Sequence, residues 1–239
     1  MNSKIPCRID ELPYAASSIR HAYLRDNDEF YRLFPKKFPK DFITMLDGKI
    51  ELVENIVKTQ IPTGKIKKIT EQITNETQSI RPKLKILESY VSDAENLQCK
   101  IDSFGIVDVR NSLLRGDPES LVSSLAILNS NITINLDALK SEGFTDEGKD
   151  FFSQKFIVLD RLNKEQNDLL IDRSQIVMKN QEKFNELWNM LSQILERGKK
   201  IFTDVDPSKV TDYTLTHIMK KLRRERGEKS EEGESEIIS

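Results

Sequence analysis

The chain has 239 residues, of which 37% are hydrophobic and 32% are charged, with only 9 glycines and 8 prolines. This composition favours helices over a turn-rich β fold. The 37 basic and 39 acidic residues nearly cancel, so the net charge of −2 gives no general attraction to nucleic acid or to an anionic membrane. The two cysteines, Cys7 and Cys99, are too few for a disulfide framework and are expected to be free thiols.

The first residues and the hydropathy of the chain predict a soluble, cytoplasmic protein. Residues 1–8 lack the apolar segment of a secretory signal and are expected to form a flexible N-terminus. No run in the sequence approaches the roughly 18 apolar residues that a membrane-spanning helix requires.

Apolar residues at helical spacing fill the predicted main domain, residues 9–222. Residues 9–34 predict one or two short helices, with Asp26 as the cap of the second. Residues 40–59 predict a longer helix, in which Gly48 allows a neighbouring helix to pack closely. Three phenylalanines near the prolines that separate these segments are expected to plug the end of a bundle: Phe30, Phe34 and Phe38.

Residues 65–98 carry the most regular pattern in the chain, with three-four spacing like the seam of a coiled coil. Pro82 lies in the middle, and because the pattern continues in phase on both sides, we expect a kink near Ser79 without a break. Just before this helix, Pro62-Thr63-Gly64-Lys65 resembles part of a phosphate-binding loop. The full motif and its preceding strand are missing, so Thr63 is interpreted as a helix cap.

Helix start and stop signals define the next two segments. Residues 106–115 predict a short helix that Gly116 ends, and Asp117 followed by proline predicts the start of a helix over 118–142. Within that helix, residues 129–135 have modest helix propensity and some strand-like alternation. The alternation covers too few residues to override the helical period.

Residues 145–202 predict one very long C-terminal helix with apolar ends. In its middle the seam becomes polar at four residues: Asn163, Gln166, Arg173 and Asn180. Buried amides can fix helix register and a buried arginine requires a carboxylate partner, so these residues define a candidate polar interior site or partner face. The structural interpretation, which we favour, is a helix that leaves one bundle, runs partly exposed and enters another. The sequence leaves open whether the helix is continuous or bent near 163–180.

The segment 223–239 is charged, lacks periodic apolar residues and is predicted to be a disordered tail. It overlaps a candidate basic patch formed by Lys220, Lys221, Arg223, Arg224 and Arg226. Such a patch can bind phosphate, but it has no interleaved aromatic residues for base stacking, and the acidic residues that follow compete for its charges. We therefore favour a solvated, self-compensating tail.

The two histidines limit the enzyme chemistry that we expect. A nucleophilic triad would require His21, which lies near Ser17 and Ser18, or His217, which follows Thr214 and Thr216. Neither histidine belongs to a Glu-x-x-His or His-Glu-x-x-His metal motif. A carboxylate-only metal site from distant residues is the remaining alternative. We predict surface or boundary histidines, with no catalytic residue, no metal site and no cofactor.

Several short motifs are distributed along the chain. They are Ala22-Tyr23-Leu24-Arg25, Phe104-Gly105, Leu114-Arg115-Gly116-Asp117, Asp212-Tyr213-Thr214-Leu215 and Lys220-Lys221-Leu222-Arg223-Arg224. Together they resemble uncharacterised all-helical proteins of Bacteroidetes genomes. The resemblance covers most of the chain and implies a helical bundle with no known activity, so it carries over no catalytic residue.

These patterns predict an all-α, elongated, up-and-down bundle, either single or divided into two sub-bundles that share helix 145–202. The predicted function is non-enzymatic: a structural or interaction module that presents helix faces to a protein partner or to another copy of itself. A membrane-active protein like the long-helix pore-forming toxins is one alternative, although polar residues interrupt the most apolar window, 121–136. Nucleic-acid binding through residues 220–226 is another alternative.

Overall fold

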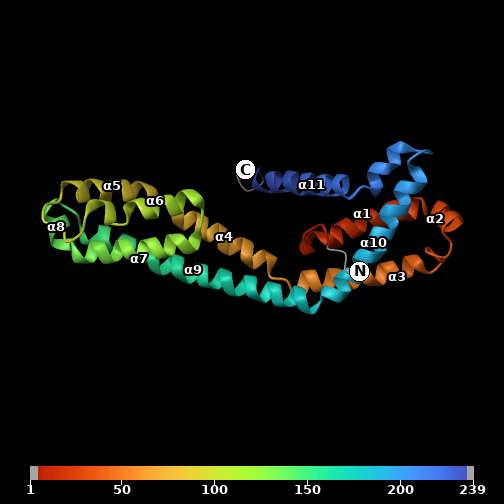
Figure 1. The fold of residues 1–239 in the computed structure, drawn as a ribbon, viewed down its shortest axis with the longest axis horizontal. Coiled ribbons are helices and arrows are strands. Elements are labelled where there is room, and N and C mark those ends of the chain that lie inside the picture. Colours follow the sequence, from red (N-terminus) through yellow and green to blue (C-terminus); the bar gives the residue numbers. More distant parts are fainter. Residues whose placement is uncertain (1–4, 236–239) are drawn as a thin grey trace. The chain divides into compact units, whose positions relative to one another are not determined.

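The computed structural model describes residues 5–235 and shows an all-α protein, as composition and periodicity predict (Figure 1). This described part of the chain contains no strand. Contacts divide the chain into two compact units: unit 1 comprises Met1–Ile61 and Arg173–Ser239, and unit 2 comprises Pro62–Asp172. The α-helices are α1 (Leu12–Arg25), α2 (Asn27–Leu33), α3 (Phe42–Thr59), α4 (Thr63–Gln78), α5 (Ile80–Asp93), α6 (Ile106–Arg115), α7 (Pro118–Ile134), α8 (Leu136–Ser141), α9 (Asp146–Lys179), α10 (Gln181–Phe202) and α11 (Leu215–Ser235). Three 3₁₀ helices join them: η1 (Ile9–Glu11), η2 (Ile101–Ser103) and η3 (Pro207–Tyr213).

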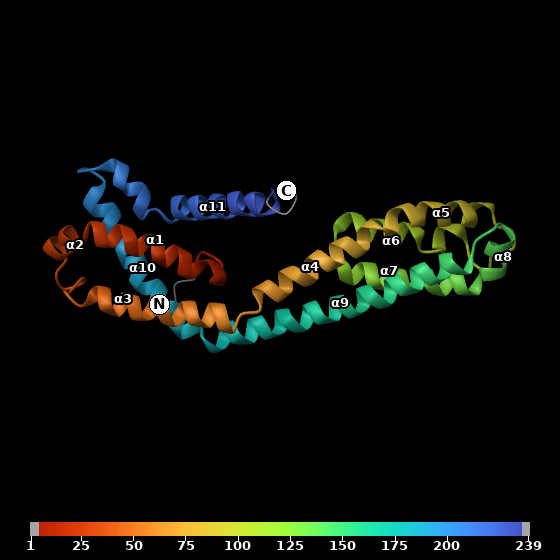
Figure 2. The same ribbon diagram turned by 180° about the vertical axis from the view of Figure 1, so that it is seen from behind.

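Unit 1 is built on α1, α3 and α10, which pack against one another (Figure 2). The predicted aromatic plug lies inside its core, where Phe30 and Phe38 are fully buried and both contact the ring of Tyr23. The helices η3 and α11 pack on α1 and bring the C-terminal part of the chain to the N-terminal part. Side chains from one continuous apolar core join all these elements.

Unit 2 packs α4 to α8 with the N-terminal part of α9. The seam predicted over 65–98 is buried in its core, as Ile69, Ile80 and Leu87 show. Helices α6 and α7 approach closely at two small residues, Ser112 and Ser124, whose buried hydroxyls lie 3.2 Å apart. The sequence left open whether the seam pairs within the chain, and its place in this core shows that it does.

Three predicted helix boundaries are confirmed by backbone geometry. Gly116 ends α6 with a φ of 64°, a left-handed conformation that glycine adopts without strain. Asp117 caps α7, because its carboxylate accepts hydrogen bonds from the backbone N–H groups of Glu119 and Ser120 at 3.1 and 3.2 Å. The hydroxyl of Thr145 accepts from the N–H of Gly148 at 3.2 Å at the start of α9.

The helix predicted over 65–98 is two helices, α4 and α5, separated at Ser79. The expected position near Ser79 is right, and the interruption is this single residue, whose backbone keeps right-handed helical angles (φ −76°, ψ −14°). Pro82 has no N–H group, so the helical hydrogen bond to the carbonyl of Gln78 cannot form. The chain instead begins a new helix with proline in its first turn, where the missing donor costs nothing.

The helix predicted over 118–142 is also divided, into α7 and α8, at Asn135. The buried Asn135 side chain accepts a hydrogen bond from the backbone N–H of Gln98 at 2.5 Å and donates one to the carbonyl of Asn131 at 2.8 Å. An asparagine that hydrogen-bonds nearby backbone competes with helix continuation. Helix rather than strand was the right assignment for 129–134, and Asn131 and Asn135 hydrogen-bond the loop before α6.

The long predicted helix 145–202 forms α9 and α10, with an interruption at Asn180. Both apolar ends are buried, and Trp188 lies in the core of unit 1. The boundary between the units falls inside α9, after Asp172. The structural interpretation of the polar middle, a helix that passes from one bundle to another, agrees with this division.

Three local expectations differ from the structure. Thr63 is not a cap: Pro62 occupies the cap position of α4, and the buried Thr63 hydroxyl has no hydrogen-bond partner among the described residues. Gly48 does not admit a close neighbour, because a Cβ built there would meet no atom within 4 Å. Helix α11 continues to Ser235, where the sequence analysis placed a disordered tail from residue 223, since its Lys, Arg and Glu residues favour helix. Residues 236–239 of that tail lie outside the described part.

Candidate functional site

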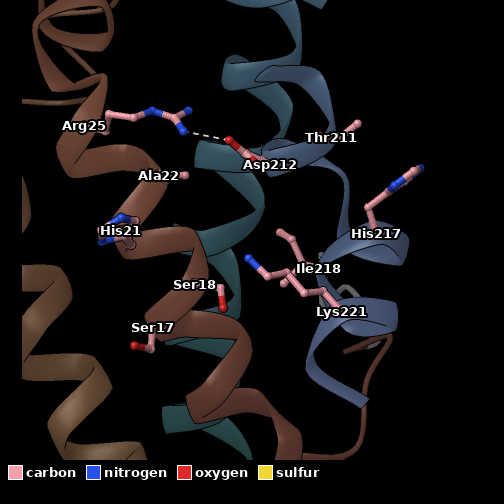
Figure 3. Close-up of a pocket in the computed structure, with 10 residues that line it drawn as sticks. All are labelled: Ser17, Ser18, His21, Ala22, Arg25, Thr211, Asp212, His217, Ile218 and Lys221. Carbon is pink, nitrogen blue, oxygen red and sulfur yellow. Dashed lines mark hydrogen bonds and ion pairs between the residues drawn. The ribbon is translucent and has the colours of Figure 1, made fainter. Parts of the chain in front are cut away.

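A groove in unit 1 lies between α1 and α11, with η3 at one end, and we call it the α1–α11 groove (Figure 3). Its volume is about 650 Å³. Helix α1 contributes Ser17, Ser18, His21, Ala22 and Arg25. The C-terminal segment contributes Thr211, Asp212, His217, Ile218 and Lys221. The fold thus brings the two histidines of the chain to one cavity.

The histidines do not form a nucleophile–base pair. His21 and His217 are both exposed, and within residues 5–235 neither imidazole is hydrogen-bonded to a serine, a threonine or a carboxylate. Figure 3 shows the ring of His217 pointing away from α1. A base must reach the proton of its nucleophile at hydrogen-bond distance, and this arrangement places no hydroxyl there.

The end of the groove is fixed by an ion pair between Arg25 and Asp212, whose Nη1 and Oδ2 atoms lie 2.7 Å apart (Figure 3). Behind it, the carboxylate of Asp26 is only 3% exposed and contacts Arg25 and the Lys209 ammonium, each at 2.7 Å. Burial alone would raise the pKa of Asp26. Hydrogen bonds from Arg25, Lys209 and Tyr213 outweigh burial and lower this pKa to about 2.

Tyr213 anchors η3 against α1 and α10. Its buried hydroxyl donates to the carboxylate of Asp26 at 2.8 Å and lies 3.0 Å from the carbonyl oxygen of Ala22. Its ring stacks on Phe202 with an interplanar angle of 13°. Burial raises the pKa of Tyr213 well above its ordinary value, so the phenol stays protonated and keeps its role as donor.

The sequence analysis assigned Asp26 to a helix cap and did not predict this cluster. Asp26 occupies the cap position of α2, but its side chain makes no cap hydrogen bond. Its partners Lys209 and Tyr213 come from the other end of the chain. No local pattern could reveal that pairing; a carboxylate, a lysine and a tyrosine so far apart in sequence carry no common spacing.

The four residues of the predicted polar seam do not converge on one site. In unit 2, Asn163 is half-buried and Gln166 donates a hydrogen bond to the Thr70 hydroxyl at 2.8 Å. In unit 1, Arg173 pairs with Asp10 at 2.8 Å, which supplies the carboxylate partner that the sequence requires. Asn180 is 3% exposed and donates to the Ile176 carbonyl at 2.9 Å. Gln166 and Arg173 contact neighbouring elements, whereas Asn180 bonds to the preceding turn, so these residues form no common site.

The candidate basic patch lies on α11, and its members have different surroundings. Arg223 is paired with the buried Glu11 at 2.9 Å, and this hydrogen bond keeps the pKa of Glu11 below its usual value. Lys220, Lys221 and Arg224 are exposed, and Lys221 lines the α1–α11 groove. The side chain of Arg226 lies outside the described residues.

Cys7 and Cys99 are both free and half-buried, as expected for unpaired thiols. Burial and the nearby carboxylate of Glu11 raise the pKa of Cys7 to about 11. Because the thiolate is the reactive form, this raised pKa makes Cys7 a weak nucleophile at neutral pH.

A second groove lies in unit 2 between α5 and α6, and we call it the α5–α6 groove. Its volume is about 430 Å³. Its apolar surface comes from Pro82, Leu84, Leu113 and Leu114, and its charged margin from Arg81, Lys85 and Arg110. No acidic side chain lines it.

Searches of the described residues for other kinds of site give no candidate. No three His, Cys, Asp or Glu side chains lie close enough to hold a metal ion in this part of the chain. Of the helices described, none combines the length and apolarity needed to cross a bilayer. Comparison of the chain with protein-family models, with curated proteins and with solved structures finds no match.

Proposed function

We propose that the protein is a non-enzymatic, cytoplasmic interaction module whose α5–α6 groove binds an acidic, amphipathic helical segment of a protein partner. The observation that carries this proposal is an apolar groove with a cationic margin and no acidic lining residue. A helix that lays its apolar face into such a groove is a common mode of peptide recognition.

The apolar part of the groove has side chains available for a partner. Leu114 is 67% exposed, whereas Leu84 beneath it is 2% exposed and belongs to the core of unit 2. On α6, Val107 is also exposed and lies on the same face as Leu114, seven residues apart. Burial of an exposed leucine against a partner contributes about 1.5–3 kcal/mol, so a few such contacts support binding.

The charged margin of the groove favours a partner segment of negative charge. Arg110 is paired with Glu88 at 2.6 Å and remains close to half-exposed. Among the described residues, Arg81 and Lys85 form no ion pair with a carboxylate. Glutamates that flank the apolar residues of a partner helix would meet these cations, whereas lysines there would be repelled, so the margin favours an acidic segment.

A pair of model peptides tests the proposal directly. A fluorescent amphipathic peptide of leucine and glutamate is expected to bind the full chain in an anisotropy titration, and a leucine and lysine peptide of the same pattern is expected not to bind. Leu114→Glu places a charge in the groove and is expected to weaken binding by at least about tenfold, equivalent to about 1.4 kcal/mol. Because Leu114 is exposed, this variant retains the fold.

Ile157→Glu is the matched control. Ile157 is similarly exposed on α9 of the same unit and does not line the groove, so its replacement is expected to leave binding unchanged. Equal effects of the two variants, or equal binding of the two peptides, would contradict the proposal. Light scattering at two protein concentrations distinguishes a foreign partner from a second copy of the chain, because only self-association raises the mass with concentration.

A further inference from the structure

We infer that the α1–α11 groove of unit 1 is a binding site for the phosphate group of a small phosphate monoester. This inference is independent of the α5–α6 groove, which belongs to unit 2. It rests on the cavity, on the side chains that face each other across it and on the balance of their charges (Figure 3).

The charge balance of the α1–α11 groove favours an anion. Its lining includes two permanent cations, Arg25 and Lys221, and one carboxylate, Asp212. Asp212 is paired with Arg25 at 2.7 Å, and Arg25 also contacts the buried Asp26, so Lys221 is the lining cation that remains for an anion. Lys221 has no carboxylate partner among the side chains that the structure describes, and Figure 3 shows its ammonium extended from α11 toward α1, on the side of Ser18.

The remaining polar side chains suit a tetrahedral oxyanion. Lysine offers three donors and a compact charge, and the hydroxyl of Ser18 on the facing helix is a further donor. The groove lies beside the first turns of α11, whose N-terminal end carries partial positive charge and adds to the attraction.

The volume of the groove suits a phosphate ester better than a free phosphate ion. A volume of about 650 Å³ lies within the range of small-molecule sites and greatly exceeds one phosphate group. Its apolar floor, Ala22 and Ile218, is buried and can contact the organic part of a ligand. We therefore assign Lys221 and Ser18 to the phosphate and the apolar floor to the group that it esterifies.

Calorimetric titration of the full chain with phenyl phosphate and with inorganic phosphate tests this assignment. Saturable binding is expected for both probes, with phenyl phosphate the tighter by at least a few fold. Lys221→Met keeps the aliphatic stem, removes the charge and is expected to weaken binding by about tenfold. Lys220→Met is the control: Lys220 is the exposed neighbour that does not line the groove, and its loss is expected to leave affinity unchanged.

The inference is overturned if no probe binds saturably, or if Lys220→Met and Lys221→Met have equal effects. Equal affinity for inorganic and phenyl phosphate would overturn its assignment to an ester.

Discussion

Asp26 joins α1 to η3 through three side chains, and its energetic role follows from its burial. A carboxylate taken out of water is costly unless hydrogen bonds and opposite charges replace the water. Arg25, Lys209 and Tyr213 make that replacement. Asparagine at this position would leave the Lys209 ammonium without its partner while Arg25 kept Asp212, so the cluster would lose its central charge.

Asp26→Asn is expected to lower the free energy of unfolding by about 3 kcal/mol near neutral pH. The pKa of about 2 in the folded protein lies below the ordinary value of 3.8. Ionised Asp26 therefore stabilises the fold fully above about pH 4, and this contribution is lost as the pH falls toward 2. At about 1.4 kcal/mol per pKa unit, the part that depends on pH is roughly 2 kcal/mol. Urea unfolding of both proteins at several pH values measures it.

Asp204→Asn is the control for this experiment, because Asp204 is exposed in the turn after α10. Its replacement is expected to change the free energy of unfolding by less than about 0.5 kcal/mol at any pH. The difference in free energy of unfolding between wild type and Asp26→Asn should narrow as the solution is acidified. A gap of constant size would show that the carboxylate is not the group that titrates with unfolding.

At the residue scale, sequence predicted some features that depend on neighbours in the chain, although the caps expected at Thr63 and Asp26 are not formed, and it missed what depends on distant partners. Asp117 and Gly116 were assigned correctly because a cap and a left-handed glycine act on the backbone next to them. Arg173 was predicted to require a carboxylate, but nothing in its segment indicates Asp10. The two histidines were expected to be surface or boundary residues, and only the packing of α11 on α1 places both of them on one groove.

At the scale of single helices, two glycines show how helix packing depends on the presence of a Cβ atom. Gly198 lies in α10 against the buried ring of Tyr213, and a Cβ built at Gly198 would overlap that ring. Gly48 lies in α3 with open space around it. The same substitution therefore has opposite consequences in two helices of unit 1.

Gly48→Ala is expected to stabilise the protein by about 0.5–1 kcal/mol, because alanine favours a helix interior and nothing obstructs its methyl group. Gly198→Ala is expected to destabilise it by about 1–3 kcal/mol, because the Tyr213 ring must move from its stack on Phe202. Thermal unfolding followed by circular dichroism compares both variants with wild type. Stabilisation by both substitutions would show that η3 does not pack on α10 as described.

Helix type was predictable for most elements, and so was the interruption near Ser79, whereas the bend near 163–180 was left open and the break at Asn135 was not predicted. The three-four spacing of apolar residues persists across Ser79, Asn135 and Asn180, so periodicity alone favours continuous helices there. At Ser79 the cause is covalent, since Pro82 cannot donate the helical hydrogen bond. At Asn135 the cause is a hydrogen bond from Gln98, a residue of a different segment. A helix break caused by proline can be predicted from the sequence, whereas a break caused by a tertiary contact cannot.

At the scale of the whole molecule, the two units differ in how the chain forms them. Unit 2 is a single continuous segment, Pro62–Asp172, whereas unit 1 is formed by both ends of the chain. The sequence predicted two sub-bundles sharing a long helix as one option, but could not place the boundary. That boundary depends on which apolar faces meet: Leu159 and Leu162 of α9 join one core, and Phe184 of α10 joins the other.

The fragment 62–172 is expected to fold by itself, because it is continuous and contains a complete apolar core. It should show helical circular dichroism and one cooperative transition in urea. The shorter fragment 62–145 lacks α9 and with it the buried side chains of Phe152, Leu159 and Leu162. Loss of three large apolar contributions at about 2 kcal/mol or more each exceeds the margin that a small domain has, so this fragment should not unfold cooperatively. Cooperative unfolding of both fragments, or of neither, would show that the core of unit 2 is not closed by α9.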